Sequence, residues 1–423
     1  MNPGLYLEFL AAQAKVDRRE VLSIVAKSGF AGALAALGMT ATAAPAGADS
    51  GQQGQHGGGG GGGFSDRIFD YANPANLSDW APSRYGAGDQ RGSFNEVTPD
   101  KTTETVRSLL DRGRTVKTYN LGERMWNGFP AFVTTPARGH HMRMTVTGYV
   151  PPADFVANGG YITSLTPIGS NKVSVHEERF PSVPLAPAGS TYQIATQIDN
   201  LNHVGAGELF YNGNRGPDFL TAYGTKILGG EHMGPIVTRG VVLDILGLKI
   251  AQRATGALGP PAPNGKPVLT SNYRITLEDI DAAMHRERIR SIEPGDVVLI
   301  RTGWNQLLQG RTAAGISRWS GAGGLPGPYV REAMFFGSNR CACVGSDTWA
   351  LEVLGSPDNV PGTAFPVHQE LFLRHGVRIG ESIVVDELVA DGVYECVYIV
   401  TPQFVEGSTC GNTPPVALAN PKG

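Results

Sequence analysis

The 423-residue chain is short of the features that mark several protein classes. Its formal net charge is only −3, 17% of its residues are charged, and no block of like charges occurs. Because a basic field is what draws proteins to phosphate backbones, nucleic acid is excluded as an expected partner. Hydrophobic residues make up 41% of the chain, which indicates a globular protein with a sizeable core.

Cysteine is also scarce. The chain has Cys341, Cys343, Cys396 and Cys410, and no CxxC pair. Four cysteines in a chain of this length do not make a disulfide framework. No spacing supports a zinc–thiolate site, although the sequence leaves open both that site and a bridge formed after export.

A long run without charge occurs at the N-terminus. Residues 17–22 read Asp-Arg-Arg-Glu-Val-Leu, a twin-arginine pattern, and residues 28–48 are uncharged and end in small residues that suit cleavage. We expect residues 1–48 to be a Tat-type signal peptide and the mature protein to be periplasmic or secreted. An uncleaved membrane anchor is the alternative.

A glycine run at residues 57–63 has no side chains to bury, so residues 49–63 are predicted to form a flexible linker. A single folded domain is then expected at residues 64–423. No later span is apolar enough to cross a membrane, so no membrane association is expected after signal cleavage.

The remaining chain alternates between helix and strand patterns without an internal repeat. Helices are predicted over residues 98–112, 276–287, 328–336 and 366–375. Strands are predicted over residues 115–121, 143–149, 194–198, 235–246, 296–302, 341–345, 382–388 and 395–401. The alternation predicts a single α/β domain on a mixed β-sheet, with the polar stretches 152–190 and 205–232 as long loops over a site.

Polar side chains gather in residues 191–203. Residues two apart on a strand share a face, so Gln193, Gln197 and Asp199 are predicted to line one side. The turn that follows can bring His203 toward the same side. An ordinary core strand would carry Val or Leu at these positions, so the pattern predicts a site.

This stretch resembles a degenerate copy of the His-x-Gly-Thr-His-x-Asp-x-Pro-x-His signature of the putative cyclase family, which includes bacterial kynurenine formamidases and isatin hydrolases. Thr196, Asp199 and His203 match, while Gln193 and Gln197 stand where the family has its two early histidines. The resemblance implies a swivelling β/β/α cyclase-like fold, a homo-oligomer and a small-molecule substrate.

Residues 365–381 resemble the family's C-terminal signature, in which a His opens a helix and a Glu follows the Gly that ends it. The match falls on His368 and Glu381, which are one residue further apart than in the usual formamidase pattern. One extra residue near His375 would account for the difference. The resemblance implies that Asp199, His368 and Glu381 are metal ligands. Other stretches fit the family in the same order, namely residues 84–92, 234–244, 295–304 and 345–348.

Two carboxylates and one imidazole suit a hard or borderline divalent ion and leave positions open for water. Formamidases with the full signature use the early histidines to complete a two-metal site. Because glutamines replace those histidines here, one ion is expected, with Mn and Zn both open. A glutamine offers a neutral oxygen, so Gln197 is a candidate further ligand.

The resemblance therefore implies an exported metal-dependent, arylformamidase-like hydrolase that cleaves an amide, lactam or ester bond with activated water. His203 is the expected acid and base, and a ligand role is its alternative. Trp126, Phe129 and Tyr211 are candidate walls of an aromatic pocket, whereas Trp304 is expected in the core. Two other functions stay open: a non-catalytic periplasmic protein that binds a metal or small molecule, and a lyase on the same metal site.

Overall fold

A computed structural model describes residues 63–110, 115–130, 139–140, 143–167, 170–172, 174–179 and 192–421. The expected signal peptide and nearly all of the expected linker lie outside these residues. Within them, no helix is long and apolar enough to cross a bilayer. All four cysteines are described, and each is buried and free rather than bridged.

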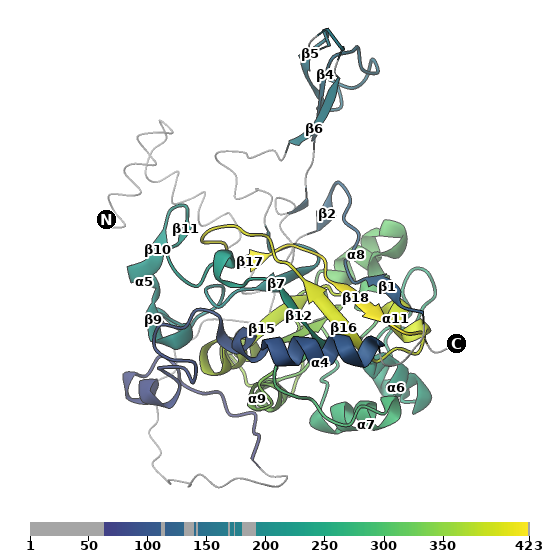
Figure 1. Cartoon of the computed structure of the whole chain (residues 1–423). Coiled ribbons are helices and arrows are strands. Elements are labelled where there is room, and N and C mark those ends of the chain that lie inside the picture. The colour runs from purple at the N-terminus through teal and green to yellow at the C-terminus, as the bar shows by residue number, and fades with distance from the viewer. Residues whose placement is uncertain are drawn as a thin grey trace, which may run out of the picture. The chain divides into compact units, whose positions relative to one another are not determined.

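A large mixed sheet is the frame of the fold (Figure 1). Its strands are β1 (Lys117–Asn120), β7 (Gln197–Asp199), β12 (Ile236–Leu243), β13 (Val297–Ile300), β14 (Cys343–Ser346), β15 (Arg378–Glu381), β16 (Glu395–Val400), β17 (Cys410–Gly411) and β18 (Val416–Ala419). They lie in the order β1-β18-β16-β12-β13-β14-β15-β7-β17. The run from β12 to β15 is parallel and the strands flanking it are antiparallel, so the predicted mixed α/β sheet is confirmed.

Short strands form small separate sheets. These pair β2 (Phe129–Pro130) with β3 (Gly139–His140), β4 (Arg143–Thr147) with β5 (Tyr161–Ser164) and β6 (Val175–Arg179), β8 (Leu209–Phe210) with β9 (Asn214–Arg215), and β10 (Leu220–Thr221) with β11 (Gly224–Thr225). The α-helices of the described residues are α4 (Pro99–Leu110), α5 (Gly216–Phe219), α6 (Ile245–Ala251), α7 (Leu277–Glu287), α8 (Ala313–Trp319), α9 (Val330–Ser338), α10 (Pro366–Gln369) and α11 (Asp386–Ala390). A π-helix, η7 (Glu370–His375), follows α10 directly.

Both faces of the large sheet are buried. Along β13, Val298 and Ile300 belong to one hydrophobic cluster, and Val297 and Leu299 belong to another, as the alternation of a strand requires. The first cluster also holds buried residues of α6, α7, α9 and η7. Helix α4 packs across β12 and β16 (Figure 1). This burial on two sides explains the continuous apolar runs of the central strands.

Helix boundaries follow local capping. The Thr276 hydroxyl and the Asp279 carboxylate form a capping box at the start of α7. The prediction that Pro328 is the first residue of the next helix is wrong. Helix α9 begins at Val330, because the Glu332 carboxylate accepts the backbone N–H of Tyr329 and makes that residue the N-cap.

The predicted strand over residues 382–388 is wrong. Strand β15 ends at Glu381, and Ser382 has a left-handed backbone with φ of 50°. The N–H groups of Ser382 and Ile383 bond to the carbonyls of Thr348 and Ser346, which turns the chain out of the ladder. The chain then forms helix α11 instead of a strand.

Residues 91–94, which precede α4, contact strand β15, the strand that ends at Glu381. Arg378 of β15 is fully buried, and its guanidinium donates to the backbone carbonyl of Arg91 and lies 4.3 Å from the centre of the Phe94 ring. Burial lowers the pKa of Arg378 to about 10. The N-terminal part of the described chain therefore helps to fix β15.

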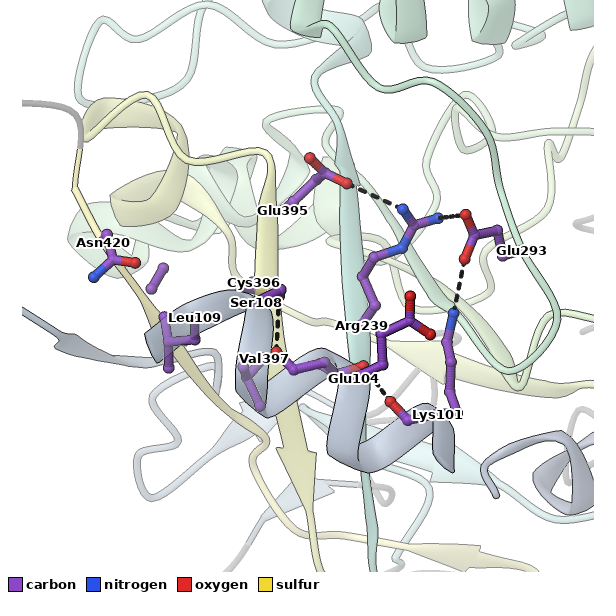
Figure 2. Close-up of a pocket in the computed structure, with 12 residues that line it drawn as sticks. Lys101, Glu104, Ser108, Leu109, Arg239, Glu293, Glu395, Cys396, Val397 and Asn420 are labelled. Carbon is purple, nitrogen blue, oxygen red and sulfur yellow. Dashed lines mark hydrogen bonds and ion pairs between the residues drawn. The ribbon is translucent and has the colours of Figure 1, made fainter. Parts of the chain in front are cut away.

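An ion-pair network joins α4 to the sheet around a cavity of about 170 Å³ (Figure 2). The Arg239 guanidinium lies 2.5 Å from Asp296 Oδ2 and 3.1 Å from Glu395 Oε1. Lys101 Nζ lies 2.8 Å from Asp296 Oδ1 and 3.2 Å from Glu293. Asp296 is fully buried, so its charge depends on these two cations.

We expect Arg239→Ala to lower the free energy of unfolding by about 3–5 kcal/mol, because it leaves the buried Asp296 carboxylate with Lys101 as its one cationic partner. Arg215→Ala is the matched control, since it removes an ion pair whose two side chains are 57% and 61% exposed, and its loss of stability should be much smaller. Urea unfolding measures both. Equal losses would contradict a structural role for the buried network.

Candidate metal centre

The register between β7 and β15 brings two acidic residues together. Gln197 lies opposite Glu381, and Asp199 lies opposite Ile379 in the antiparallel pair. Glu381 is the last residue of a parallel strand, so the site lies at the carboxyl end of the sheet, where open α/β sheets commonly bind ligands. Asp199 and Glu381 are both buried.

The prediction of one extended strand from residue 194 is wrong. Strand β7 has only three residues, and Ala195 just before it has φ of 53°. Gln193 nevertheless reaches the site, because the chain folds back and its Oε1 accepts a hydrogen bond from Gln197 Nε2 at 2.5 Å. Tertiary folding, rather than strand alternation, places Gln193 there.

The imidazole of His368 completes the cluster. His368 lies in α10, whose first residue is Pro366, and is buried. Its Nε2 lies 3.9 Å from Asp199 Oδ2 and 3.7 Å from Glu381 Oε1. Asp199, His368 and Glu381 each offer a ligand atom within 4.8 Å of the others. The structure therefore brings together the three residues that the sequence indicated as ligands.

Gln197 contacts one oxygen of each of the two carboxylates. Its Nε2 lies 2.6 Å from Glu381 Oε2 and 3.4 Å from Asp199 Oδ1. The remaining oxygens, Glu381 Oε1 and Asp199 Oδ2, are the ones that face His368. Gln197 Oε1 is buried and has no hydrogen-bond partner among the described residues, so a ligand role through that oxygen stays a prediction.

Burial disfavours the ionised forms of the two carboxylic acids in the cluster. Desolvation raises the pKa of Asp199, and desolvation together with the charge of Asp199 raises the pKa of Glu381 to about 8. Burial alone would lower the pKa of His368, but hydrogen bonds to Glu352 and the nearby Glu381 raise it to about 10. The cluster therefore needs positive charge, which protons or a cation can supply.

The donor set fits a divalent cation. Asp199 Oδ2 is fully buried and has no hydrogen-bond partner among the described residues. Two atoms on one zinc ion can be separated by at most twice the metal–ligand distance, roughly 4.0–4.4 Å. The separations of His368 Nε2 from the two carboxylate oxygens, 3.9 and 3.7 Å, fall within that limit. Carboxylate and imidazole ligands suit Mn and Zn.

A cavity of about 170 Å³ adjoins the cluster. Its lining residues are Gln193, His203, Val204, Trp349, Ala350, Phe365, His368 and Glu381. His203 is partly exposed, at 26% of its side chain, and its Nε2 lies 3.9 Å from Asp199 Oδ2. The imidazole thus lies between the buried acid and the open space.

The aromatic walls of this cavity differ from those predicted. Tyr211 is fully buried and its hydroxyl donates to Asp89, and Phe129 is fully buried in a hydrophobic cluster. Trp126 packs against Phe129 and does not line the cavity either. Trp349 and Phe365 form the aromatic walls instead. Trp304 is in the core, as expected.

Sequence reasoning missed Glu352. This residue is fully buried, and its Oε1 lies 2.5 Å from His368 Nδ1. Its two oxygens also accept the backbone N–H groups of Val367 and His368. The available signal was a carboxylate inside the apolar run of residues 350–354, since buried acids are rarely unpaired.

Four non-glycine residues near the site have left-handed backbone conformations. Ala195, Leu351, Phe365 and Ser382 all have positive φ, between 50° and 57°. Each is adjacent to, or within three residues of, a side chain of the site. Such conformations cost non-glycine residues about 1–2 kcal/mol each, so the surrounding fold must impose them.

Comparisons with known proteins address the fold. The model of the putative cyclase family matches residues 144–353. A solved structure described as a novel cyclase is 26% identical, with a TM-score of 0.61, and the match covers 80% of this chain and 98% of that one. The chain belongs to the putative cyclase family. Among curated proteins, none matches the sequence.

More distant structures resemble this cyclase-family chain. Isatin hydrolase A from Ralstonia solanacearum is 16% identical, covers 75% of this chain and 97% of its own, and has a TM-score of 0.47. The same enzyme from Labrenzia aggregata, bound to benzyl benzoate, is 17% identical, covers 75% and 98%, and has a TM-score of 0.45.

The family match and the site overlap only in part. The matched residues 144–353 include Asp199, His203 and Glu352 of this cyclase-family chain. His368 and Glu381 lie beyond the matched range, and the parallel pairing of β14 with β15 and the position of α10 bring them into the site.

We expect Mn²⁺ or Zn²⁺ to raise the melting temperature of chelator-treated protein, because a ligand that binds only the native state stabilises it. At 100 times Kd the gain is about 2.7 kcal/mol, which corresponds to roughly 3–4 °C for a domain of this size. Differential scanning fluorimetry measures the shift. Asp199→Asn should abolish it, and Glu287→Gln, which changes a buried carboxylate outside the cluster, should keep it.

Proposed function

We propose that this chain is a metal-dependent hydrolase that cleaves an amide, lactam or ester bond of a small molecule. The observation that carries the proposal is the buried cluster of Asp199, His368 and Glu381 beside a cavity with His203 on its wall. The cluster supplies ligands, and the cavity supplies space for a substrate next to them.

Asp199, His368 and Glu381 would hold the ion. A divalent ion in such a centre lowers the pKa of water from 15.7 toward 7 and polarises a carbonyl group. The Gln197 amide group faces one oxygen of each carboxylate, and this supports a single ion on the opposite side, with Mn and Zn as the candidates.

His203 is the proposed proton carrier. Its Nε2 lies 3.9 Å from Asp199 Oδ2, and its side chain is partly exposed, so it can exchange protons with solvent. A departing amine needs a proton as its bond to carbon breaks, and a histidine on the cavity wall can deliver one. Trp349 and Phe365 shield the reacting bond from bulk water and offer aromatic surface to the substrate.

We also propose that the enzyme acts outside the cytoplasm. The twin-arginine pattern of residues 17–22 and the uncharged run that follows support export by a pathway that carries folded proteins. A folded-state metal centre is compatible with that route. A homo-oligomeric state stays a prediction from the family resemblance alone.

His203→Ala should reduce hydrolysis roughly 10²–10⁴-fold while metal content is unchanged, because it removes proton transfer and no proposed ligand. A panel of formyl-anilides, isatin-like lactams and lactones provides the substrates, and steady-state kinetics provides the rates. His285→Ala, an exposed histidine on α7, is the matched control. An unchanged rate in His203→Ala would remove this residue from the mechanism.

The full-length protein should contain about one equivalent of Mn or Zn, and Asp199→Ala should lose it. Elemental mass spectrometry measures both. Two equivalents would contradict the single-ion proposal. One equivalent with no turnover on the whole panel would favour the alternative function, a protein that binds a metal or small molecule without catalysis, which the glutamines at 193 and 197 motivate.

A further inference from the structure

We propose that Glu352 is a positioning residue that fixes the ring orientation and the tautomer of His368 for metal binding through Nε2. This inference rests on the proposed metal centre and adds to it a residue outside the ligand set. Its basis is the contact between Glu352 Oε1 and His368 Nδ1, at 2.5 Å, inside a fully buried environment.

The geometry assigns each ring nitrogen a different task. Nε2 points to Asp199 and Glu381, and Nδ1 points away from them to Glu352. A carboxylate accepts hydrogen bonds and does not donate them, so it holds the proton on Nδ1 and leaves a lone pair on Nε2. Metal-binding histidines commonly depend on such a partner, which also makes the ring more basic.

Glu352 must be a carboxylate because it accepts from three N–H groups on two oxygens. Oε1 receives His368 Nδ1–H and the backbone N–H of His368, and Oε2 faces the backbone N–H of Val367. A glutamine in the same place has one oxygen and one NH₂ group. Whichever way it is turned, its NH₂ group meets at least one N–H donor, so the arrangement cannot be satisfied.

The backbone around Glu352 keeps this carboxylate in place. Leu351, just before it, has φ of 57°, and Trp349 and Ala350 line the cavity. The carbonyl of Thr348 accepts the N–H of Ser382, which ties the same loop to the end of β15. One loop thus contacts the cavity, the strand of Glu381 and the imidazole.

A glutamic acid in a similar setting provides a matched control. Glu332 is also fully buried and accepts the backbone N–H groups of Tyr329 and Leu277, at the start of α9. It has no contact with His368 or the carboxylate pair. Glu332→Gln therefore reproduces the loss of a buried, helix-capping carboxylate without touching the centre.

The test measures Mn²⁺ affinity of the full chain by isothermal titration calorimetry for wild type, Glu352→Gln and Glu332→Gln. We expect Glu352→Gln to weaken Mn²⁺ binding 10–100-fold and Glu332→Gln to leave it nearly unchanged. Equal affinities for all three proteins, or equal losses in both variants, would overturn the proposal. No Mn²⁺ binding by the wild type would instead overturn the proposed function.

A second measurement does not depend on the folding of a variant. Ring ¹⁵N NMR of the Zn²⁺-loaded wild type should show His368 with its proton on Nδ1 and Nε2 bound to the ion. A His368 ring that carries its proton on Nε2, or that binds Zn²⁺ through Nδ1, would overturn the role of Glu352. In a folded Glu352→Gln protein, the Nδ1 proton should exchange faster with water than in the wild type.

Discussion

Mutual repulsion between two buried carboxylates is the constraint on which the site depends. The β7–β15 register sets Asp199 and Glu381 side by side in the interior. Neither acid can keep its charge there without a compensating cation or donor. The amide of Gln197 satisfies one side of the pair, and the imidazole of His368 faces the other. The remaining residues of the site can be understood as supports for this arrangement.

Glu381 and His368 lie close to the ends of their strand and helix, near residues with an irregular backbone. Glu381 ends a strand, and Ser382 directly after it has a left-handed backbone. His368 lies in the first turn of α10, whose N-cap Phe365 is also left-handed. A regular strand or helix could not aim these side chains at one point. The two hydrophobic clusters on either side of the sheet supply the stability that holds such conformations.

The sequence was sufficient for the architecture and for the three side chains that the structure brings together, Asp199, His368 and Glu381, but not for their surroundings. Apolar runs such as residues 296–302 predict buried strands directly, and the spacing around Asp199, His368 and Glu381 carries the family resemblance. The sequence did not predict that Glu352 and Trp349 lie at the site. Their positions depend on a loop whose path is set by hydrogen bonds to residues far along the chain, such as that between Ser382 N–H and the Thr348 carbonyl. The shortness of β7 and the turn after Glu381 were not predicted for the same reason. Local patterns do not encode left-handed residues in the middle of apolar sequence.

The π-helix between His368 and Glu381 has a consequence for how this family can vary in length. A π-turn accommodates one residue more than the α-helical turn it replaces, and residues 370–375 contain such a turn immediately after α10. His368 and Glu381 are one residue further apart than in the related formamidase pattern, and this turn lies between them. In a regular helix, an added residue would rotate everything beyond it by about 100°. When the insertion is confined to a widened turn, the chain becomes longer while His368 and Glu381 keep their positions relative to each other. The cluster can therefore tolerate an insertion that a regular helix could not.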